Sequence, residues 1–495
     1  MAVALTLFIV SFLIYFVSGP GHTPYDFQLS QANNIVHGHL DMTEEYTHNL
    51  NVLERVLYDG TGFCLPLNDP RGPDIDALIP NARYSADCKH YMQHALGPAF
   101  MLVPLVVLFG PDINQTLISA LVGAFTMVVI FAITRRFASD LRTQLALTVL
   151  AAFGTTMWYS AADGSVWHFA HITSVMFLFA AIWATVDRRN ALLAGVFIGV
   201  AFTCRPSTLL AGVFPLIAFA DMWLDSSPGT PLVRRINFRP LLAMGLGVAP
   251  FLALTGTVDY LRFGNPFETG YNLSEQIYQT NLAGVYDQGI FALSYIPRHI
   301  PVVFEAMPNF STQGSFMWPS YGGTALWVIS PALLLACFVH LRRYRPAALL
   351  GAAALILAGV VMLIAAVGHG LQLTDWSTAS LPFALHLLPF WLLIGLAIAL
   401  ALGLRDRLAI AAWAAVVIIA LGDWMFAATG WAQFGYRYGL DFIPFLWLLA
   451  VKAVPRVRWH HMLLIGMSVV MNLWGVLWVF KFAPAQFFGW TWTGW

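Results

Sequence analysis

The chain has 495 residues, of which 59% are hydrophobic and only 10% are charged, and its formal net charge at pH 7 is zero. Soluble domains carry about 25% charged and about 45–50% apolar residues. The composition therefore excludes a soluble protein and makes lipid the main solvent of the chain. Zero net charge excludes the basic footprint of a nucleic-acid-binding protein.

Apolar segments of membrane-spanning length recur along the chain. We expect roughly 11–13 spans, because about 17–25 apolar residues cross a bilayer as a helix. The first lacks a basic start and a small-residue cleavage site, which favours a retained span over a signal peptide. Three runs are short or broken by proline: 95–110, the pair flanking Arg205-Pro206, and 442–453. The regular predicted spans are 2–18, 114–134, 144–162, 166–186, 240–258, 323–341, 346–367, 381–403, 408–423 and 461–480.

Basic pairs in short loops predict which side of the membrane each loop faces, because such loops are enriched on the cytoplasmic side. They include Arg135-Arg136, Arg188-Arg189, Arg234-Arg235 and Arg342-Arg343. From Arg135 onward the same alternation places Asp163–His171, 259–320, 368–380 and 424–440 outside. The first loop, 19–94, is predicted outside because its acidic residues outnumber its basic ones. Segment 95–110 disturbs this pattern if it crosses, so we expect either that it does not cross or that a boundary differs.

The two long loops, 19–94 and 259–320, share the predicted outer face. Long ordered loops are uncommon and usually functional, so we expect them to carry short juxtamembrane helices and to roof a cavity. Cys64 and Cys88 both lie in the first loop. They are either a disulfide of an extracytoplasmic loop or two unpaired residues, and the spacing does not decide between these.

Two charged residues of the first loop lie close to apolar runs. Asp26 follows the first span and is a candidate general base, with a helix N-cap as the structural alternative. Lys89 precedes the run at 95–110 and is a candidate contact for a phosphate. Its alternative is a lysine that extends its ammonium group to the interface.

Polar residues also interrupt the apolar segments. Arg205 lies in a broken span, and an intramembrane charge is a functional hypothesis by default. Asp163, His168 and His171 lie in a predicted outer hairpin, where they are candidate acid, base or sugar ligands. The two histidines share a helix face, but no third strong ligand is near, so interfacial histidines are favoured over a metal site.

Two further clusters combine arginine, carboxylate and aromatic residues. Arg262 and Glu268 bracket a Gly-Asn-Pro turn, which fits either phosphate binding or a salt-bridged turn. Arg437 and Asp441 are four residues apart and would pair in a helix. Together with Lys89, Arg205 and Asp26, these arginines fall on one predicted side, where a lipid phosphate is the expected ligand.

Nucleotide-binding and hydrolase motifs are absent from the sequence: it has no Walker A, no Gly-x-Gly-x-x-Gly after a strand, no His-Glu-x-x-His and no Gly-x-Ser-x-Gly. A transferase of this composition would therefore take a donor activated by a lipid phosphate. Several degenerate motifs are present instead. They are Tyr25-Asp26 after the first span, Ala32 to Gly38, Lys89 to Pro98, Gly154 to Trp158, Arg205-Pro206, Arg262 to Tyr271, and Tyr436 to Tyr438 with Asp441 and Pro444.

In these motifs the chain resembles the GT-C superfamily of integral membrane glycosyltransferases, which includes protein O-mannosyltransferases and bacterial lipid A aminoarabinose transferases. The resemblance implies one GT-C-like transmembrane domain over 1–495, multi-pass in the inner or plasma membrane, with its site facing the extracytoplasmic side. It implies inverting transfer of a sugar from a polyprenyl-phosphate donor to a glycan, lipid or protein acceptor. No cofactor is expected, and a divalent metal is not indicated.

The resemblance also implies roles for individual residues. Asp26 would activate the acceptor hydroxyl, and Lys89 would lie near the donor phosphate. Family members often carry a second acidic residue in the hairpin, where this chain has His168 or His171. The proposed phosphate ligands are Lys89, Arg205, Arg262 and Arg437, and the proposed sugar or acceptor ligands are Tyr25, Asp163, His168, His171, Glu268 and Tyr271.

Two other functions fit the same features. A transporter or flippase of lipid-linked glycans shares the cationic cavity, but transporters usually show paired halves with matching broken helices, and no such repeat is visible in the sequence. A scaffold subunit without activity is the third interpretation, and it gains weight if Asp26 lies far from any cavity.

Overall fold

The computed structural model describes residues 2–48, 55–69, 71–72, 74–224, 236–304, 306, 308–310, 317–319, 322–339, 406–430 and 433–482. The predicted spans 346–367 and 381–403 and the predicted loop 368–380 lie outside the described residues. The described part is mainly helical and contains six short strands.

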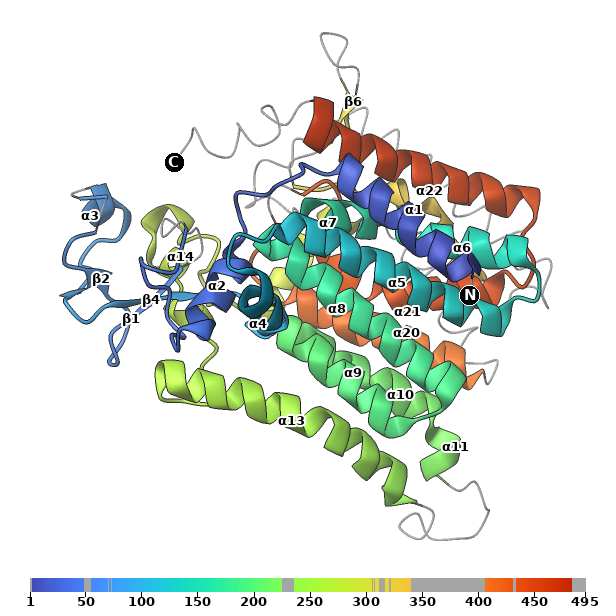
Figure 1. The fold of residues 1–495 in the computed structure, drawn as a ribbon, viewed down its shortest axis with the longest axis horizontal. Helices are drawn as coiled ribbons and strands as arrows, with labels where there is room; N and C mark the ends of the chain where they lie inside the picture. The colour runs from blue at the N-terminus through green and yellow to red at the C-terminus, as the bar shows by residue number, and fades with distance from the viewer. Residues whose placement is uncertain are drawn as a thin grey trace.

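Most helices run side by side in one elongated bundle (Figure 1). Among the described residues, five helices are long and apolar enough to cross a membrane, or six if the bent pair α6 and α7 counts as one span. This mostly helical architecture with several candidate spans is consistent with the predicted all-α, multi-pass class. The bundle comprises α1 Ala2–Ser18, α5 Gln115–Phe137, α6 Leu141–Phe153, α7 Met157–Asp163, α8 Val166–Trp183 with η1 Ala184–Arg188, α9 Ala191–Cys204, η2 Pro206–Gly212, α10 Val213–Ala218, α11 Ala220–Trp223, α13 Phe238–Phe263, α20 Arg407–Trp424, η8 Arg437–Asp441, α21 Ile443–Ala453, and α22 Trp459–Leu477 with η9 Trp478–Phe482.

Polar caps begin several of these helices. The side chains of Asn114, Asp140 and Asn190 each accept a hydrogen bond from a backbone N–H in the first turn of α5, α6 and α9. Such caps satisfy donors that a helix leaves unpaired at its start. Arg135 and Arg136 lie in the last turn of α5, where the negative end of the helix dipole stabilises a positive charge.

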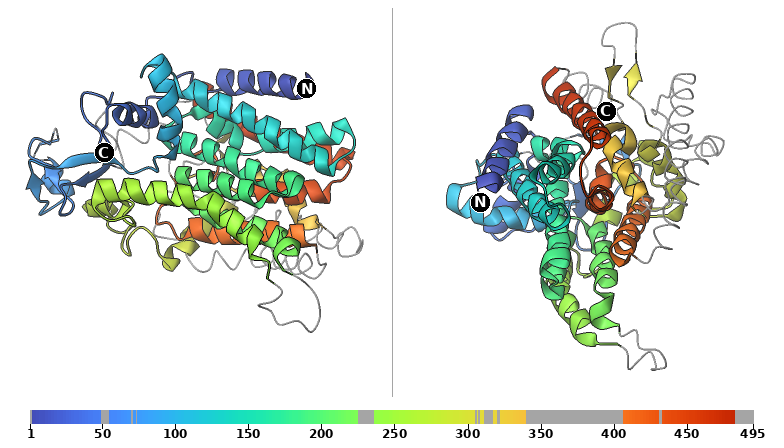
Figure 2. Two further views of the ribbon diagram at one scale, coloured as in Figure 1. Left: turned by 60° about the horizontal axis from the view of Figure 1, so that its bottom comes forward. Right: turned by 90° about the vertical axis from the view of Figure 1, so that its right-hand side faces the viewer.

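Helix α4, Gly97–Phe109, lies across the bundle. It is seen almost end-on in Figure 1 and stands upright in the left view of Figure 2, where α5 and α8 run along the bundle. Gly97 makes this possible, because a Cβ at that position would collide with the backbone of Thr203. The predicted run at 95–110 therefore does not follow the direction of the neighbouring long helices.

Segment 323–341 differs from the predicted single span. It forms α16, Leu326–Ile329, and then a 3-10 helix, η6, Pro331–Phe338. Pro331 has no backbone N–H to continue α16, so the regular helix ends before it.

The two long loops fold together at one end of the bundle, at the left in Figure 1. Strand β1 pairs antiparallel with β4, and Val56 of β1 forms a bridge with Ser274 of the second loop. Cys64 and Cys88 form a disulfide with Cα atoms 5.9 Å apart, which answers the question that their spacing left open. The elements at this end are α2 Phe27–Val36, β1 Arg55–Tyr58, β2 Leu65–Pro66, α3 Asp74–Leu78, β3 Tyr84–Ser85, β4 Lys89–Met92, η3 Tyr271–Leu273, α14 Glu275–Tyr278 and η4 Thr280–Leu282. The second loop continues through η5 Leu293–Tyr295 and α15 Ile296–Phe304 to β5 Asn309–Phe310 and β6 Met317–Trp318, and β6 lies at the top of Figure 1.

A buried ion network joins the first loop to the second. Arg55 Nε lies 2.5 Å from Glu275 Oε2, and its terminal nitrogen lies 3.0 Å from Asp69. Arg71 contacts the same two carboxylates. Two positive and two negative charges are thus balanced where the side chains of Asp69 and Glu275 are 2% and 5% exposed, which makes this network the main polar link between the loops.

We expect Glu275→Ala to destabilise the outer loops by about 3–5 kcal/mol, because it leaves the buried Arg55 to share the single carboxylate of Asp69 with the partly exposed Arg71. The measurement is protection of the first loop from proteolysis, together with thermal unfolding in detergent. The matched control is Asp287→Ala, because Asp287 pairs with Arg298 at 3.4 Å with half of its side chain exposed. Such an exposed pair contributes only about 0–1 kcal/mol. Equal effects of the two substitutions would contradict the expectation.

Candidate functional site

A small cavity of about 50 Å³ lies where α4, α9 and α13 meet the outer loops. Its polar lining comes from the end of the first loop, from the last turn of α13 and from the second loop. The residues that line it include Gln93, His94, Leu96, Gly97, Phe100, Thr203, Pro206, Val258, Asp259, Arg262, Thr269 and Tyr271.

Arg262 is the buried cation of this cavity. Its side chain is 3% exposed, donates to the backbone oxygen of Met92 at 2.6 Å, and lies 3.9 Å from Asp259. The guanidinium lies over the rings of Tyr91 and Phe263, at 5.2 and 4.6 Å. Its Nε is buried and has no hydrogen-bond partner. The site therefore holds an Arg N–H donor that the described protein atoms do not satisfy.

The pairing of Arg262 differs from the salt-bridged turn considered above. The carboxylate beside it is Asp259, one helical turn earlier on α13. Glu268 accepts a hydrogen bond from the backbone N–H of Gly270 at 2.9 Å and so stabilises its own turn. Tyr271 follows that turn and lines the cavity.

Asp26 lies at the start of α2, half-buried, and its side chain makes no capping hydrogen bond. Asp26 thus occupies the N-cap position of a helix that begins at Phe27, as the structural alternative predicts, but its carboxylate does not bond to the first turn. Its neighbour Tyr25 packs against Trp167, with ring centres 5.3 Å apart, and Trp167 packs against His94 of the cavity lining at 6.1 Å. Phe27 packs with Leu96 and Val258 of the cavity wall. Asp26 itself does not line the cavity, and it is linked to the lining only through these neighbouring side chains.

Gln115 and Gly164 hold this region to the bundle. The Gln115 side chain accepts from the N–H of Leu29 in α2 and donates to the oxygen of Gly164. Gly164 has a φ of 69° and packs against Thr116 where a Cβ would collide. The tight turn between α7 and α8 therefore needs glycine, and it brings Tyr25 within a hydrogen bond of Val166 at the start of α8.

A second polar cluster lies behind Pro206. Arg205 Nε lies 2.9 and 2.8 Å from the two oxygens of Asp441, and Ser207 donates to the same carboxylate at 2.7 Å. His171 Nδ1 lies 3.5 Å from Asp441, and Asp423 lies 3.8 Å from Arg205. The break between α9 and η2 positions Arg205 here, as expected for a broken helix inside a bundle.

The predicted hairpin residues adjoin this cluster. Asp163 accepts a short hydrogen bond from Ser165, and His168 lies 3.9 Å from Asp163 and 2.9 Å from the hydroxyl of Ser160. Arg437 lies over the ring of Tyr438 at 5.4 Å. Among the described residues, no group of three or more histidine, cysteine or acidic side chains is arranged to hold a metal ion.

The four predicted phosphate ligands occupy different surroundings. Arg262 lines the cavity, and Arg205 lies next to the lining residue Pro206 but is bound by two carboxylates. Arg437 is the first residue of η8 and lies over the ring of Tyr438, near Asp441 of the second polar cluster. Lys89 is exposed on β4 at the outer edge and does not line the cavity. The structure therefore brings Arg262, Tyr271 and the neighbours of Asp26 together, and it places Lys89 apart from them.

Three site residues had not been singled out from the sequence. Asp259 lies three residues before Arg262 in an apolar helix, and this spacing alone could have indicated a pair. Asp423 ends an apolar run and is an intramembrane charge of the kind that usually has a partner. The sequence around His299 contains no pattern that predicts its role, because its hydrogen-bond partners are more than 100 residues away in the chain.

His299 links the second loop to the bundle. It is fully buried, and its Nε2 lies 2.8 Å from the oxygen of Phe426 while its Nδ1 lies 2.8 Å from the Tyr436 hydroxyl. Because a carbonyl only accepts, Nε2 carries the proton and Nδ1 accepts from Tyr436. Burial lowers the pKa of His299 to about 4, so the ring is neutral at pH 7.

Comparison with known proteins gives no match, since no family model, curated protein or solved structure is significantly similar to the chain. The function is therefore argued from the residues and the geometry of the cavity.

We expect His299 to make the protein less stable as the pH falls. The folded pKa of about 4 lies below the ordinary value near 6.5, so between these values the unfolded chain binds a proton that the folded chain does not. The loss between pH 7 and pH 5 is about 1–2 kcal/mol from this residue. Thermal unfolding at both pH values measures it.

The variant His299→Gln keeps a donor and an acceptor but does not titrate, so its stability should change less between pH 7 and pH 5 than that of the wild type. The control is His22→Gln, which removes an exposed histidine. An unchanged pH response in His299→Gln would show that His299 does not contribute to acid sensitivity.

Proposed function

We propose that the chain is a membrane glycosyltransferase that moves a sugar from a polyprenyl-phosphate donor to an acceptor hydroxyl on the extracytoplasmic side. One observation carries the proposal: the buried guanidinium of Arg262, with an unsatisfied N–H, lines a cavity at the C-terminal end of α13, a helix that exposes apolar side chains. A phosphate attached to a long apolar chain matches both features.

Helix α13 supports a lipid donor. Its side chains Leu242, Leu246 and Leu261 are 63%, 67% and 65% exposed, and α13 lies at the edge of the bundle in Figures 1 and 2. A polyprenyl chain in the bilayer would lie along this surface and bring its phosphate to the last turn, where Arg262 is located. Burial of apolar surface favours such contact.

Arg262 would bind the donor phosphate and stabilise it as it leaves. A guanidinium is planar and always charged, and it forms paired hydrogen bonds with phosphate oxygens. In the proposed reaction the bond between the anomeric carbon and the phosphate oxygen breaks, and the electron pair stays on the polyprenyl phosphate. A fixed cation at that oxygen acts most strongly in a water-poor site.

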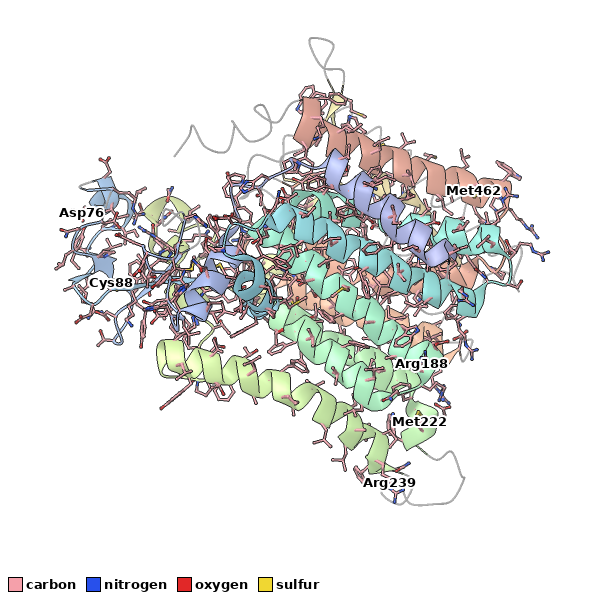
Figure 3. All side chains as sticks on the ribbon, in the orientation of Figure 1. Asp76, Cys88, Arg188, Met222, Arg239 and Met462 are labelled. Carbon is pink, nitrogen blue, oxygen red and sulfur yellow. A yellow bond between two sulfur atoms is a disulfide. The ribbon has the colours of Figure 1, made fainter. Side chains whose placement is uncertain are left out.

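Asp26 would serve as the general base. The acceptor oxygen forms its bond to the anomeric carbon on the face opposite the leaving phosphate, and Asp26 takes the hydroxyl proton. Tyr25, Trp167 and His94 give this region aromatic surfaces. The proposed outer orientation is supported by Figure 3, in which Asp76 and Cys88 lie at one end and Arg188 and Arg239 at the other.

We expect Asp26→Asn to lower transfer by about 10²–10⁴-fold, the usual contribution of a positioned base. The assay incubates purified protein with a polyprenyl phosphate carrying a radiolabelled hexose and measures release of free polyprenyl phosphate. Donor binding and thermal unfolding should stay close to wild type, because the Asp26 side chain caps no helix.

The matched control is Asp87→Asn, which makes the same change at an exposed position of the same loop. It should transfer at the wild-type rate. Normal turnover by Asp26→Asn would remove Asp26 from the mechanism. An unchanged donor with the wild-type protein, combined with its movement between leaflets of a vesicle, would instead support a flippase.

We expect the double substitution Asp259→Asn with Arg262→Gln to weaken donor use while the protein stays folded. Both charges disappear together, so no unpaired charge remains buried. Loss of one electrostatic contact to the leaving group lowers the rate by about 10²–10³-fold. The same release assay measures this, and a donor KM and kcat equal to those of the wild type would exclude Arg262 as the phosphate ligand.

A further inference from the structure

A second hollow lies far from the cavity, between α6 and α22 at the opposite end of the bundle. It is a groove of about 500 Å³, within the range of about 300–1,000 Å³ that is usual for small-molecule sites. Its walls are formed by Leu145, Ala146 and Val149 of α6 and by Met462 and Ile465 of α22. The walls are apolar, so the groove suits a hydrocarbon chain.

Arginines surround the end of this groove where both helices begin. Arg142 lines it, and the exposed residues Arg456 and Arg458 precede α22. The N–H of Val457 donates to the Thr143 hydroxyl at 2.9 Å, which holds the two arginine-bearing segments together. Within the described ranges, none of these three arginines forms an ion pair with a carboxylate. Three positive charges are therefore available at one end of an apolar groove.

Asp140 is a carboxylate beside this basic end, where it interacts electrostatically with Arg456. It caps α6 by accepting from the N–H of Thr143 at 2.8 Å. Hydrogen bonds from Thr143 lower the pKa of Asp140, and the charge of Arg456 lowers it further, so it stays ionised. One carboxylate against three arginines leaves the region with a net positive charge.

Trp459 marks the level of the membrane surface at this site. It is the first residue of α22, 76% exposed, and it directly follows Arg458. Tryptophan collects at the boundary between headgroups and acyl chains. A membrane surface at the level of Trp459 would put the groove at acyl-chain depth and the arginines at headgroup depth.

We infer that this groove binds an anionic phospholipid, with one acyl chain between α6 and α22 and the headgroup phosphate against Arg142, Arg456 and Arg458. Each arginine near an anionic headgroup contributes on the order of 1 kcal/mol, so charge selects this lipid over a zwitterionic one. The site is separate from the proposed transfer reaction. By the distribution of arginines it belongs to the cytoplasmic leaflet.

Photo-crosslinking tests this site. Wild-type protein in phosphatidylcholine nanodiscs receives a small fraction of phosphatidylglycerol with a diazirine on one acyl chain, and the labelled peptides are mapped by mass spectrometry. We expect labelling of 141–149 and 459–467 that unlabelled phosphatidylglycerol removes and added phosphatidylcholine does not. Equal competition by both lipids would overturn the inference and would show only a general lipid boundary.

Two variants separate the headgroup from the acyl chain. Replacing Arg142, Arg456 and Arg458 with glutamine should lower groove labelling about tenfold or more, given the contribution of each charge. Val149→Trp should also lower it, because it fills the groove and leaves the arginines in place. Undiminished labelling in either variant would contradict the proposed site, and the competition in wild-type protein decides the question if a variant fails to fold.

The matched control removes arginines elsewhere at the same end. Arg188 and Arg239 lie well apart from Met462 of the groove in Figure 3. Arg188→Gln with Arg239→Gln should leave groove labelling unchanged. An equal loss in this control would mean that overall charge at this end governs the labelling, and the inferred site would be wrong.

Discussion

A positive charge inside an apolar bundle must be neutralised there, because a lone ion in surroundings of low dielectric constant costs several kcal/mol. Arg205 meets this requirement through Asp441 and Asp423. The contact is possible because α9 ends at Cys204 and the chain resumes as η2, which turns the arginine toward η8 and α20. The break after α9 thereby meets α20 and η8, which lie more than 200 positions further along the chain, and the small cavity lies on the other side of Pro206.

Much of the fold follows from hydropathy. The predicted spans at 114–134, 166–186 and 408–423 agree with observed helices to within a few residues, because lipid-facing helices must be apolar for their whole length. The direction of α4 could not be predicted in this way. A run of 13 residues with an internal proline fits either a short crossing or a crosswise helix, and the close approach of Gly97 to Thr203 decides between them.

The candidate site was predictable where a charge interrupts or adjoins an apolar run, as at Asp26 and Arg262. The choice of partners was not predictable, because it depends on contacts between distant segments. Arg205 binds a carboxylate 236 positions further along, and Arg55 binds one 220 positions further along. Lys89 shows the converse case. It is close in sequence to the lining residue His94, but it lies on β4 with its side chain exposed.

The ion network of the outer loops imposes an order of assembly during synthesis. Glu275 leaves the ribosome 220 residues after Arg55 and 204 residues after Arg71. At about 5–20 residues per second this is a delay of roughly 10–40 s. Cys64 and Cys88, only 24 positions apart, can join within that interval. The disulfide of the first loop needs no later part of the chain, whereas Arg55 and Arg71 stay hydrated until more than half of the chain has been made and the second loop arrives.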